Sequence, residues 1–470
     1  MRWALRLTGL VSTAILARLL LPADFGVVAM AAVFAGLLDT VSYTGVDLML
    51  IRAGVNSREQ MNTAWTIQFV QGCIVSLLLI LVSPLATAYF HEPRVATVML
   101  WLAVKSVLDG MQNIGIVQFR KELHFSREFR FNLYCKLLNL IFVVAAAFYL
   151  RNYLALVVGL VSGSAISVLL SYGMHPYRPR FSLAEARNMW SFSTWLLVSQ
   201  VGSFLSRKTD QFIIGGAIGS TALGNYHVAT EIATMPTSEL VMPMRRALFP
   251  TLSMLQQDPA AFRTATLHTF GGLAAVCFLL GFGLFATARE AVAVVLGPQW
   301  HAAVPLVQWL ALYGAFTGLA SILEVPMWVN GKTHVSAIQS WVELAGLVPL
   351  LIVAVRWRGI EGAAMSRAVI AAAVLPMMLW LLSRVCPISF ADLVRALWRP
   401  LASGILMMIC LGALPLPEST LLSLIIKITL GALVYVLSLT ALWWVSGQSQ
   451  GIESAILERA REFARPARSG

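Results

Sequence analysis

AILARLLLPADFGVVAMAAVFAGLLDTVSYTGVDLMLIR, residues 14–52, decides the fold. The stretch predicts the end of one membrane helix, a tight turn at residues 21–24, and a second helix that begins at Phe25-Gly26. A proline near a helix start and Asp24 as a cap for the exposed N–H groups fit such a turn. Arg18 and Asp39 interrupt these apolar helices. A charge at bilayer depth costs at least ~2.5 kcal/mol, so we expect both to face an interior cavity or a partner.

The same turn returns in the second half of the chain as IGSTALGNY, residues 218–226. Leu223-Gly224 stands there in the place of Phe25-Gly26. One half of the protein is therefore predicted to be a copy of the other, with a polar seam between them.

Composition excludes a soluble domain. The 470 residues are 58% hydrophobic and 12% charged, whereas soluble chains carry about 25% charged residues. The apolar segments reach the roughly 20 residues that span a membrane, and we count about fourteen of them. They lie near residues 2–20, 25–50, 63–90, 95–117, 131–150, 153–174, 190–217, 222–244, 264–287, 301–326, 334–355, 359–383, 399–415 and 420–445. The fold class is all-α integral membrane.

The net charge of +12 is explained by topology, without nucleic acid as a partner. With the N-terminus inside, most Lys and Arg fall in cytoplasmic segments, including the segments near residues 118–127 and 250–262, which we expect to be loops. This asymmetry follows the positive-inside rule and predicts a multi-pass inner-membrane protein with both termini cytoplasmic. The five cysteines show no metal-binding or disulfide spacing, and we expect neither a metal nor a cofactor.

The chain is expected to divide into five parts. They are an N-lobe of six helices (1–174), a cytoplasmic linker rich in Pro and Arg (175–189), a C-lobe of six helices (190–383), two peripheral helices (384–446) and a cytoplasmic tail (447–470). The tail is either a short amphipathic helix on the anionic leaflet or disordered.

Two groups of charges lie within predicted helices. Lys105 and Asp109 are four residues apart on one helical face, as an internal ion pair or as part of a transport path. Arg207, Lys208 and Asp210 place three charges in four residues, which fits either a structural network or a substrate site. Lys427, in the last helix, has no evident role in the sequence.

Several motifs together resemble the polysaccharide transporter family, the flippases for lipid-linked O-antigen, colanic acid and other exopolysaccharide repeat units. The closest likeness is to the colanic acid exporter type. In the first half the motifs are Leu16-Ala17-Arg18-Leu19-Leu20, Asp24-Phe25-Gly26, Asp39 and Gly45. In the second half they are residues 210–215, Leu223-Gly224-Asn225-Tyr226, Leu248-Phe249-Pro250 with Gln256, and Gly297-Pro298-Gln299-Trp300. The resemblance departs at the N-terminus, where members carry further residues before this start.

The resemblance implies the fold of multidrug and toxin extrusion transporters, with two pseudo-symmetric six-helix lobes in a V, two appended helices and transport by alternating access. The implied cargo is a polyprenyl-pyrophosphate-linked oligosaccharide, carried for lipopolysaccharide O-antigen or exopolysaccharide synthesis. Its sugars and pyrophosphate cannot enter hydrocarbon without losing several kcal/mol per unpaired group. We expect pyrophosphate ligands among the buried cations Arg18, Lys105, Lys136, Arg207, Lys208 and Arg367. We expect charge balance, sugar binding or ion coupling from Asp39, Asp109, Asp210, Glu231, Glu324 and Glu343.

Three other functions stay open. A cation-coupled multidrug antiporter of the same fold would need an acidic, aromatic pocket, and the buried Arg and Lys fit an anionic cargo better. A lipid II flippase belongs to the same class. A membrane polysaccharide polymerase would need a larger external segment than residues 287–302, so we do not expect an enzyme. Coupling to protons or sodium, and contacts with membrane lipids and other assembly proteins, are compatible with the sequence.

Overall fold

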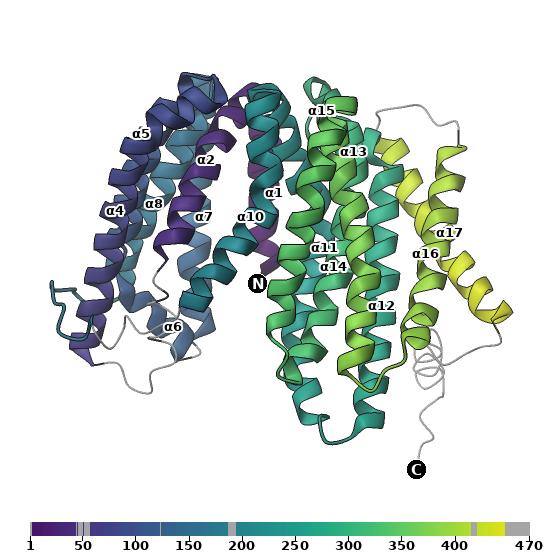
Figure 1. The fold of residues 1–470 in the computed structure, drawn as a ribbon. Coiled ribbons are helices and arrows are strands. Elements are labelled where there is room, and N and C mark those ends of the chain that lie inside the picture. The colour runs from purple at the N-terminus through teal and green to yellow at the C-terminus, as the bar shows by residue number, and fades with distance from the viewer. Residues whose placement is uncertain are drawn as a thin grey trace, which may run out of the picture. The chain divides into compact units, whose positions relative to one another are not determined.

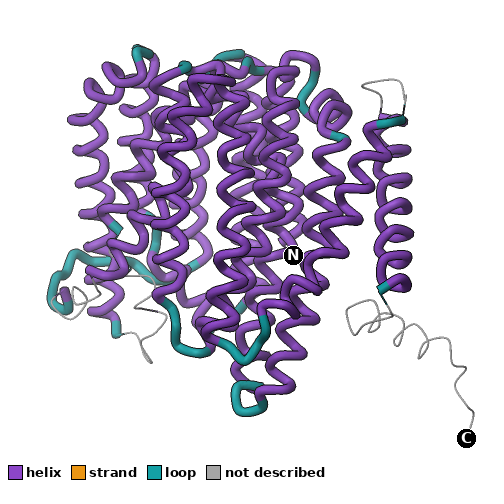
Figure 2. The backbone as a smooth tube through the Cα atoms, turned by 45° about the vertical axis from the view of Figure 1, so that its right-hand side comes forward, coloured by secondary structure: helices purple, strands orange, loops and turns teal. Residues whose placement is uncertain are grey.

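The computed structural model describes residues 2–43, 45, 50, 57–122, 124–186, 194–414 and 421–446. These residues form helices joined by short loops, and no strand occurs among them (Figure 2). The chain divides into two compact units, residues 1–227 and 228–470. These are packing units, and the predicted limits of the two six-helix lobes stay a prediction.

Unit 1 contains the helices of the first half and the start of α11 (Figure 1). They are α1 (Arg2–Leu19), α2 (Pro22–Ser42), α4 (Arg58–Phe90), α5 (Arg94–Met111), η1 (Ile114–Ile116), α6 (Val117–Lys121), α7 (Phe125–Leu150), α8 (Leu154–Met174), α10 (Thr194–Ala217) and α11 (Ser220–Met254). The helix α4 packs along α5, α5 along α8, and α8 along α7. The helices α2 and α10 lie against each other, and α1 lies against α7.

Unit 2 contains the rest of α11 and all later helices. They are α12 (Pro259–Ala286), α13 (Ala288–Val295), η2 (Pro298–Ala303), α14 (Val304–Val329), α15 (His334–Val385), α16 (Phe390–Gly412) and α17 (Leu421–Val445). Phe270, Phe278, Leu319 and Leu379 lie in its buried core. The helix α12 packs against both α14 and α16, so α16 and α17 extend the bundle of this unit.

The predicted membrane-spanning segments are found in the predicted order. Nine helices among the described residues are long and apolar enough to cross a membrane. One of them, α15, is broken at Gly359, whose φ of 57° lies in the left-handed region that favours glycine. The two limbs of α15 count as two spans, which raises the number to ten. The more polar or shorter helices α1, α5, α10 and α11 complete the fourteen expected helices. The protein is an all-α, multi-pass membrane protein.

The turn before α2 forms as the sequence predicts. Pro22 is the first residue of the helix, where a missing N–H costs nothing. The carboxylate of Asp24 accepts a hydrogen bond from the N–H of Leu21 at 3.0 Å. This bond satisfies one of the backbone donors that a helix start leaves exposed.

The two copies of the repeated turn pack directly against each other in unit 1. A Cβ atom on Gly26 would lie 1.7 Å from the carbonyl oxygen of Ser220, and one on Gly224 would lie 1.8 Å from that of Pro22. Only glycine permits backbones to approach this closely. The repeat in the sequence therefore marks a contact between the starts of α2 and α11.

The described part of the predicted linker, residues 175–186, lies along α4. The amide oxygen of Asn62 accepts hydrogen bonds from the hydroxyl of Tyr177 at 2.6 Å and from the N–H of Arg180 at 3.0 Å. Burial raises the pKa of Tyr177 to about 12, so its phenol remains a donor. These bonds fix the linker to unit 1.

His175, at the start of this segment, is held in its neutral form. Its Nδ1 accepts a hydrogen bond from the N–H of Tyr177 at 3.2 Å, and its Nε2 lies 3.2 Å from Oε1 of Gln118. The pairing assigns the proton to Nε2. Burial lowers the pKa of His175, with smaller effects from the charges of Glu122, which raises it, and of Arg127 and Arg178, which lower it.

Two predicted loops are largely helical. Residues 118–127 are taken up by α6 and the start of α7, and α11 continues through Pro250 to Met254 before α12 begins at Pro259. Pro in a helix removes one backbone hydrogen bond, which a membrane helix tolerates. The prediction for the tail, residues 447–470, lies outside the described residues, as does part of the region predicted to end the second helix.

Candidate functional site

The first charged group of unit 1 joins α2 and α5. Nζ of Lys105 lies 2.6 Å from Oδ2 of Asp109, which confirms that these residues form an ion pair. The charges of both act on Asp39, in α2. Lys105 and Asp109 are 30% and 48% exposed at their side chains, so the pair is open on one side. One cation stands with two carboxylates here, which makes this group a poor anion site.

The second group lies on α10 and the start of α11. Asp210 is buried, and its carboxylate accepts a hydrogen bond from the hydroxyl of Tyr226 at 2.5 Å. Nζ of Lys208 donates to the amide oxygen of Gln211 at 3.1 Å. Arg207, one residue before Lys208, is exposed. Asp210 thus joins α10 to α11. Arg207 is three residues before Asp210 on the same side of α10, and Lys208 is on another face.

Arg18 and Lys136 complete the candidates of unit 1. Arg18 lies in the last turn of α1 and Lys136 lies in α7, and both are exposed. The helices that carry them pack against each other.

In unit 2 the break at Gly359 lets the two limbs of α15 pair with each other. Nη1 of Arg367 lies 3.4 Å from Oε1 of Glu343, although the two residues are 24 positions apart. The guanidinium of Arg367 also stacks 5.4 Å from the ring centroid of Tyr313, in α14. Arg367 is only 2% exposed and Glu343 14%. This pair is buried and connects three helical segments.

Glu324 takes part in a further polar group of unit 2. Its carboxylate accepts hydrogen bonds from Nη2 of Arg245 at 3.1 Å and from the hydroxyl of Ser336 at 3.0 Å. The guanidinium of Arg245 lies 4.9 Å from the ring centroid of Trp328. Sequence reasoning missed Arg245, because it was placed at a helix end beside a loop. Glu231, in α11, is exposed.

Lys427 has a buried partner. Its Nζ lies 2.6 Å from Oε1 of Glu290, which is in the short helix α13 and is only 1% exposed. The pair joins α17 to α13, and it was missed because 137 residues separate the two side chains.

The predicted residues therefore do not form one site within either unit. Lys105, Asp109, Glu343 and Arg367 are in ion pairs, Asp210 is bonded to a tyrosine, and Glu324 is bonded to Arg245. The other predicted cations, Arg18, Lys136, Arg207 and Lys208, are exposed or half-buried. Arg207 and Lys208 are adjacent in α10, and their part in an anion site stays a prediction.

Comparison with known sequences finds similarity to polysaccharide biosynthesis proteins. The profile of a family described as "Polysaccharide biosynthesis protein" matches residues 15–305. Over 334 residues the chain is 24% identical to the lipopolysaccharide biosynthesis protein WzxC of Escherichia coli K12, covering 70% of this chain and 68% of WzxC. It is 25% identical over 292 residues to the teichuronic acid biosynthesis protein TuaB of Bacillus subtilis, covering 61% and 59% of the two chains.

Solved structures show the fold. The lipid II flippase MurJ, in an inward closed conformation, aligns with a TM-score of 0.75 over 94% of this chain and 97% of its own, at 12% identity. An inward-facing multidrug resistance transporter of the MATE family, in the MOP superfamily, aligns with a TM-score of 0.55 over 81% and 95%, at 16% identity. The predicted relation to the extrusion transporters is thus confirmed at the level of the fold.

Proposed function

Since the chain belongs to the polysaccharide biosynthesis protein family, we propose that it is a flippase that translocates a polyprenyl-pyrophosphate-linked oligosaccharide across the bacterial inner membrane. The repeat unit would serve lipopolysaccharide O-antigen or exopolysaccharide synthesis. The observation that carries the proposal is the family match, which covers residues 15–305, most of unit 1 and part of unit 2. The curated relatives are named for lipopolysaccharide and teichuronic acid biosynthesis, and a transporter rather than an enzyme fits this family and fold.

Such a cargo needs a protein only for its polar end. Removing water from unpaired sugar hydroxyls costs several kcal/mol each, and removing it from a pyrophosphate costs far more. The polyprenyl tail is as apolar as the bilayer and can stay in lipid. Alternating access would then require a polar path for the headgroup, opened first to the cytoplasm and then to the outside.

Arg207 and Lys208 are our preferred pyrophosphate ligands. They are adjacent cations in α10, Arg207 exposed and Lys208 half-buried, so one site there would combine two positive charges. Lys105 and Arg367 each stand against a carboxylate, that of Asp109 and that of Glu343. Binding an anion at either of these would require it to compete with a fixed negative charge.

The membrane potential would favour export. We propose that both termini are cytoplasmic, from the distribution of Lys and Arg. An anionic headgroup that leaves the negative interior gains about 2.3 kcal/mol per charge per 100 mV. The membrane potential can act on the headgroup charge in this way without coupled movement of a proton or a sodium ion.

Export of surface polysaccharide in the native host tests the proposal. Deletion of the gene should abolish surface polysaccharide and cause the lipid-linked repeat unit to accumulate in the inner membrane. The wild-type gene should restore export, whereas an Arg207→Ala/Lys208→Ala variant should insert normally and export poorly. Arg395→Ala is the matched control, because Arg395 is 77% exposed at a unit 2 helix and lies outside the candidate group.

Two results would contradict the proposal. Normal surface polysaccharide after deletion would reject the assigned cargo, and a lethal cell-wall defect would indicate a lipid II flippase instead. Full export by the double variant would not affect the assignment of the cargo, but it would exclude Arg207 and Lys208 as pyrophosphate ligands.

A further inference from the structure

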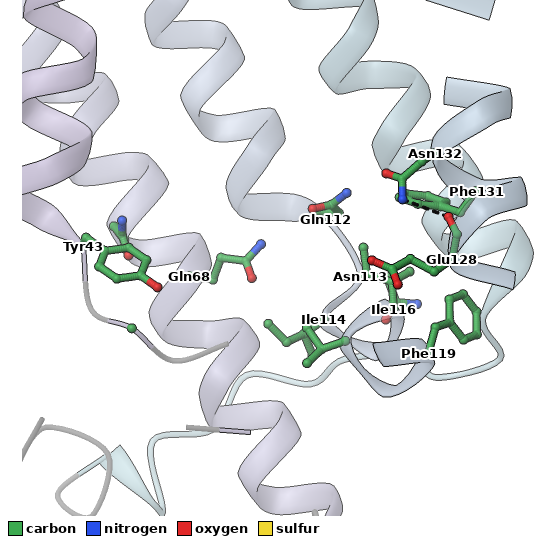
Figure 3. A pocket seen from close by; sticks show the side chains of 13 residues that line it. Tyr43, Gln68, Gln112, Asn113, Ile114, Ile116, Phe119, Glu128, Phe131 and Asn132 are labelled. Carbon is green, nitrogen blue, oxygen red and sulfur yellow. Dashed lines mark hydrogen bonds between the residues drawn. The ribbon is translucent and has the colours of Figure 1, made fainter. Parts of the chain in front are cut away.

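A cavity of about 300 Å³ lies within unit 1, and none of the charged residues predicted from the sequence to bind substrate or couple ions is among the described residues that line it (Figure 3). Its polar lining includes Tyr43 after α2, Gln68 in α4, Gln112 after α5, and Glu128 and Asn132 in α7, and η1 and α6 add apolar residues. Figure 3 shows Gln68, Gln112 and Glu128 reaching toward the same space. Its volume is at the lower end of small-molecule sites, which are about 300–1,000 Å³.

The polar groups of the cavity offer both hydrogen-bond donors and acceptors. Nε2 of Gln68 donates to the carbonyl of Asp109 at 2.9 Å, and Nε2 of Gln112 donates to the hydroxyl of Ser167 at 2.5 Å. Nδ2 of Asn132 donates to the carbonyl of Glu128 at 2.9 Å. Each amide therefore uses one N–H on the protein, and its second N–H and its carbonyl oxygen can serve a ligand.

The lining suits a sugar and does not suit a phosphate. No lysine, arginine or histidine is among the described residues that line the cavity, while the carboxylate of Glu128 is. The lining therefore offers no cation to a phosphate, whereas sugar hydroxyl groups can donate to the amide and carboxylate oxygens and accept from the amide N–H groups. Phe119 and Phe131 supply apolar walls, against which the C–H face of a pyranose ring can pack.

We propose that this cavity binds one neutral sugar residue of the transported headgroup. The inference rests on the proposed function, since a sugar ligand is expected of a carrier of lipid-linked glycans. It separates two tasks: the cavity holds a sugar through amide groups and a carboxylate, and cations elsewhere hold the pyrophosphate. In the proposed orientation the cavity lies near the cytoplasmic end of unit 1. The reason is that Phe119, which lines the cavity, belongs to the segment 118–127 that is predicted to be cytoplasmic.

Binding of soluble glycosides to the full-length purified protein tests the inference. The probes are the methyl glycosides of glucose, galactose and N-acetylglucosamine, observed by saturation-transfer NMR in detergent micelles. At least one should bind the wild-type protein, and Gln68→Leu/Asn132→Leu should weaken that binding at least tenfold. Tyr43→Phe should also weaken glycoside binding. Because it removes only a hydroxyl group, it is not expected to disturb folding, so a loss of binding in this variant cannot be attributed to a folding defect. Asn139→Leu is the control, because Asn139 lies two turns further along α7 and bonds Ser162 instead.

Each outcome decides the inference. It is overturned if no glycoside binds up to tens of millimolar, if the double variant binds as well as the wild type, or if tetraphenylphosphonium alone binds in a Glu128-dependent way. The proposed function is judged separately, by translocation of lipid-linked oligosaccharide. Translocation without glycoside binding rejects only the cavity, and glycoside binding without translocation rejects only the flippase.

Discussion

The contact between the two repeated turns gives the sharpest stability prediction. Gly26→Ala would place a Cβ 1.7 Å from the carbonyl oxygen of Ser220. Real Cβ atoms stay at least 3.0 Å away, so the starts of α2 and α11 would have to separate by about 1.3 Å, the difference between the two distances. Gly224→Ala meets the carbonyl of Pro22 at 1.8 Å and should behave alike.

The expected magnitude follows from two opposing terms. Overpacking of a rigid contact costs about 1–3 kcal/mol. Replacing glycine by alanine within a helix returns about 0.5–1 kcal/mol. Because the clash is with backbone atoms, which cannot rotate away, we expect a net loss of about 1–2 kcal/mol for each variant. Gly9→Ala is the control, since nothing lies within 4 Å of its added Cβ in α1.

Unfolding in detergent micelles, followed by denaturant titration, measures these changes. Gly26→Ala and Gly224→Ala should be destabilised, whereas Gly9→Ala should be neutral or stabilised. Equal stability of all three variants would refute the close contact between the repeated turns.

Three further predictions concern charged side chains. Lys427→Met should destabilise unit 2 by about 3–5 kcal/mol, because it leaves Glu290 buried without its cation, and adding Glu290→Gln should restore much of the loss in a double-mutant cycle. The free energy of unfolding should fall as pH drops below 6.5, because the lowered pKa of His175 lets the unfolded chain bind a proton that the folded chain does not. His175→Gln should reduce this pH dependence, which denaturant titrations above and below pH 6.5 measure. Exchanging Lys105 and Asp109 should restore export lost by either single reversal; failure of the exchanged pair would show that position matters beyond charge pairing.

The sequence determines the local features of this fold well. Hydropathy locates the helices, because each must hide its own backbone from lipid. Pro22 and Asp24 specify a helix start through short-range bonds. Lys105 and Asp109 are predictable as a pair since four residues make one helical turn.

Partners distant in the chain could not be predicted in this way. Glu290 and Lys427 meet only through tertiary packing, and the pairing of Glu343 with Arg367 depends on the break at Gly359. The cavity was missed for another reason. Glutamine and asparagine are tolerated at many helix positions, so Gln68 and its neighbours give no signal comparable to that of a charge at membrane depth.

The central claim is that this chain moves a lipid-linked oligosaccharide across a membrane, and translocation in liposomes tests it most directly. Purified protein is reconstituted with a polyprenyl-pyrophosphate-linked oligosaccharide in both leaflets, and a glycosidase that cannot cross the bilayer is added outside. The account predicts that the inner-leaflet pool becomes accessible with the wild-type protein, slowly with Arg207→Ala/Lys208→Ala, and not in protein-free liposomes. An inner-leaflet pool that stays protected in the presence of folded wild-type protein would contradict it.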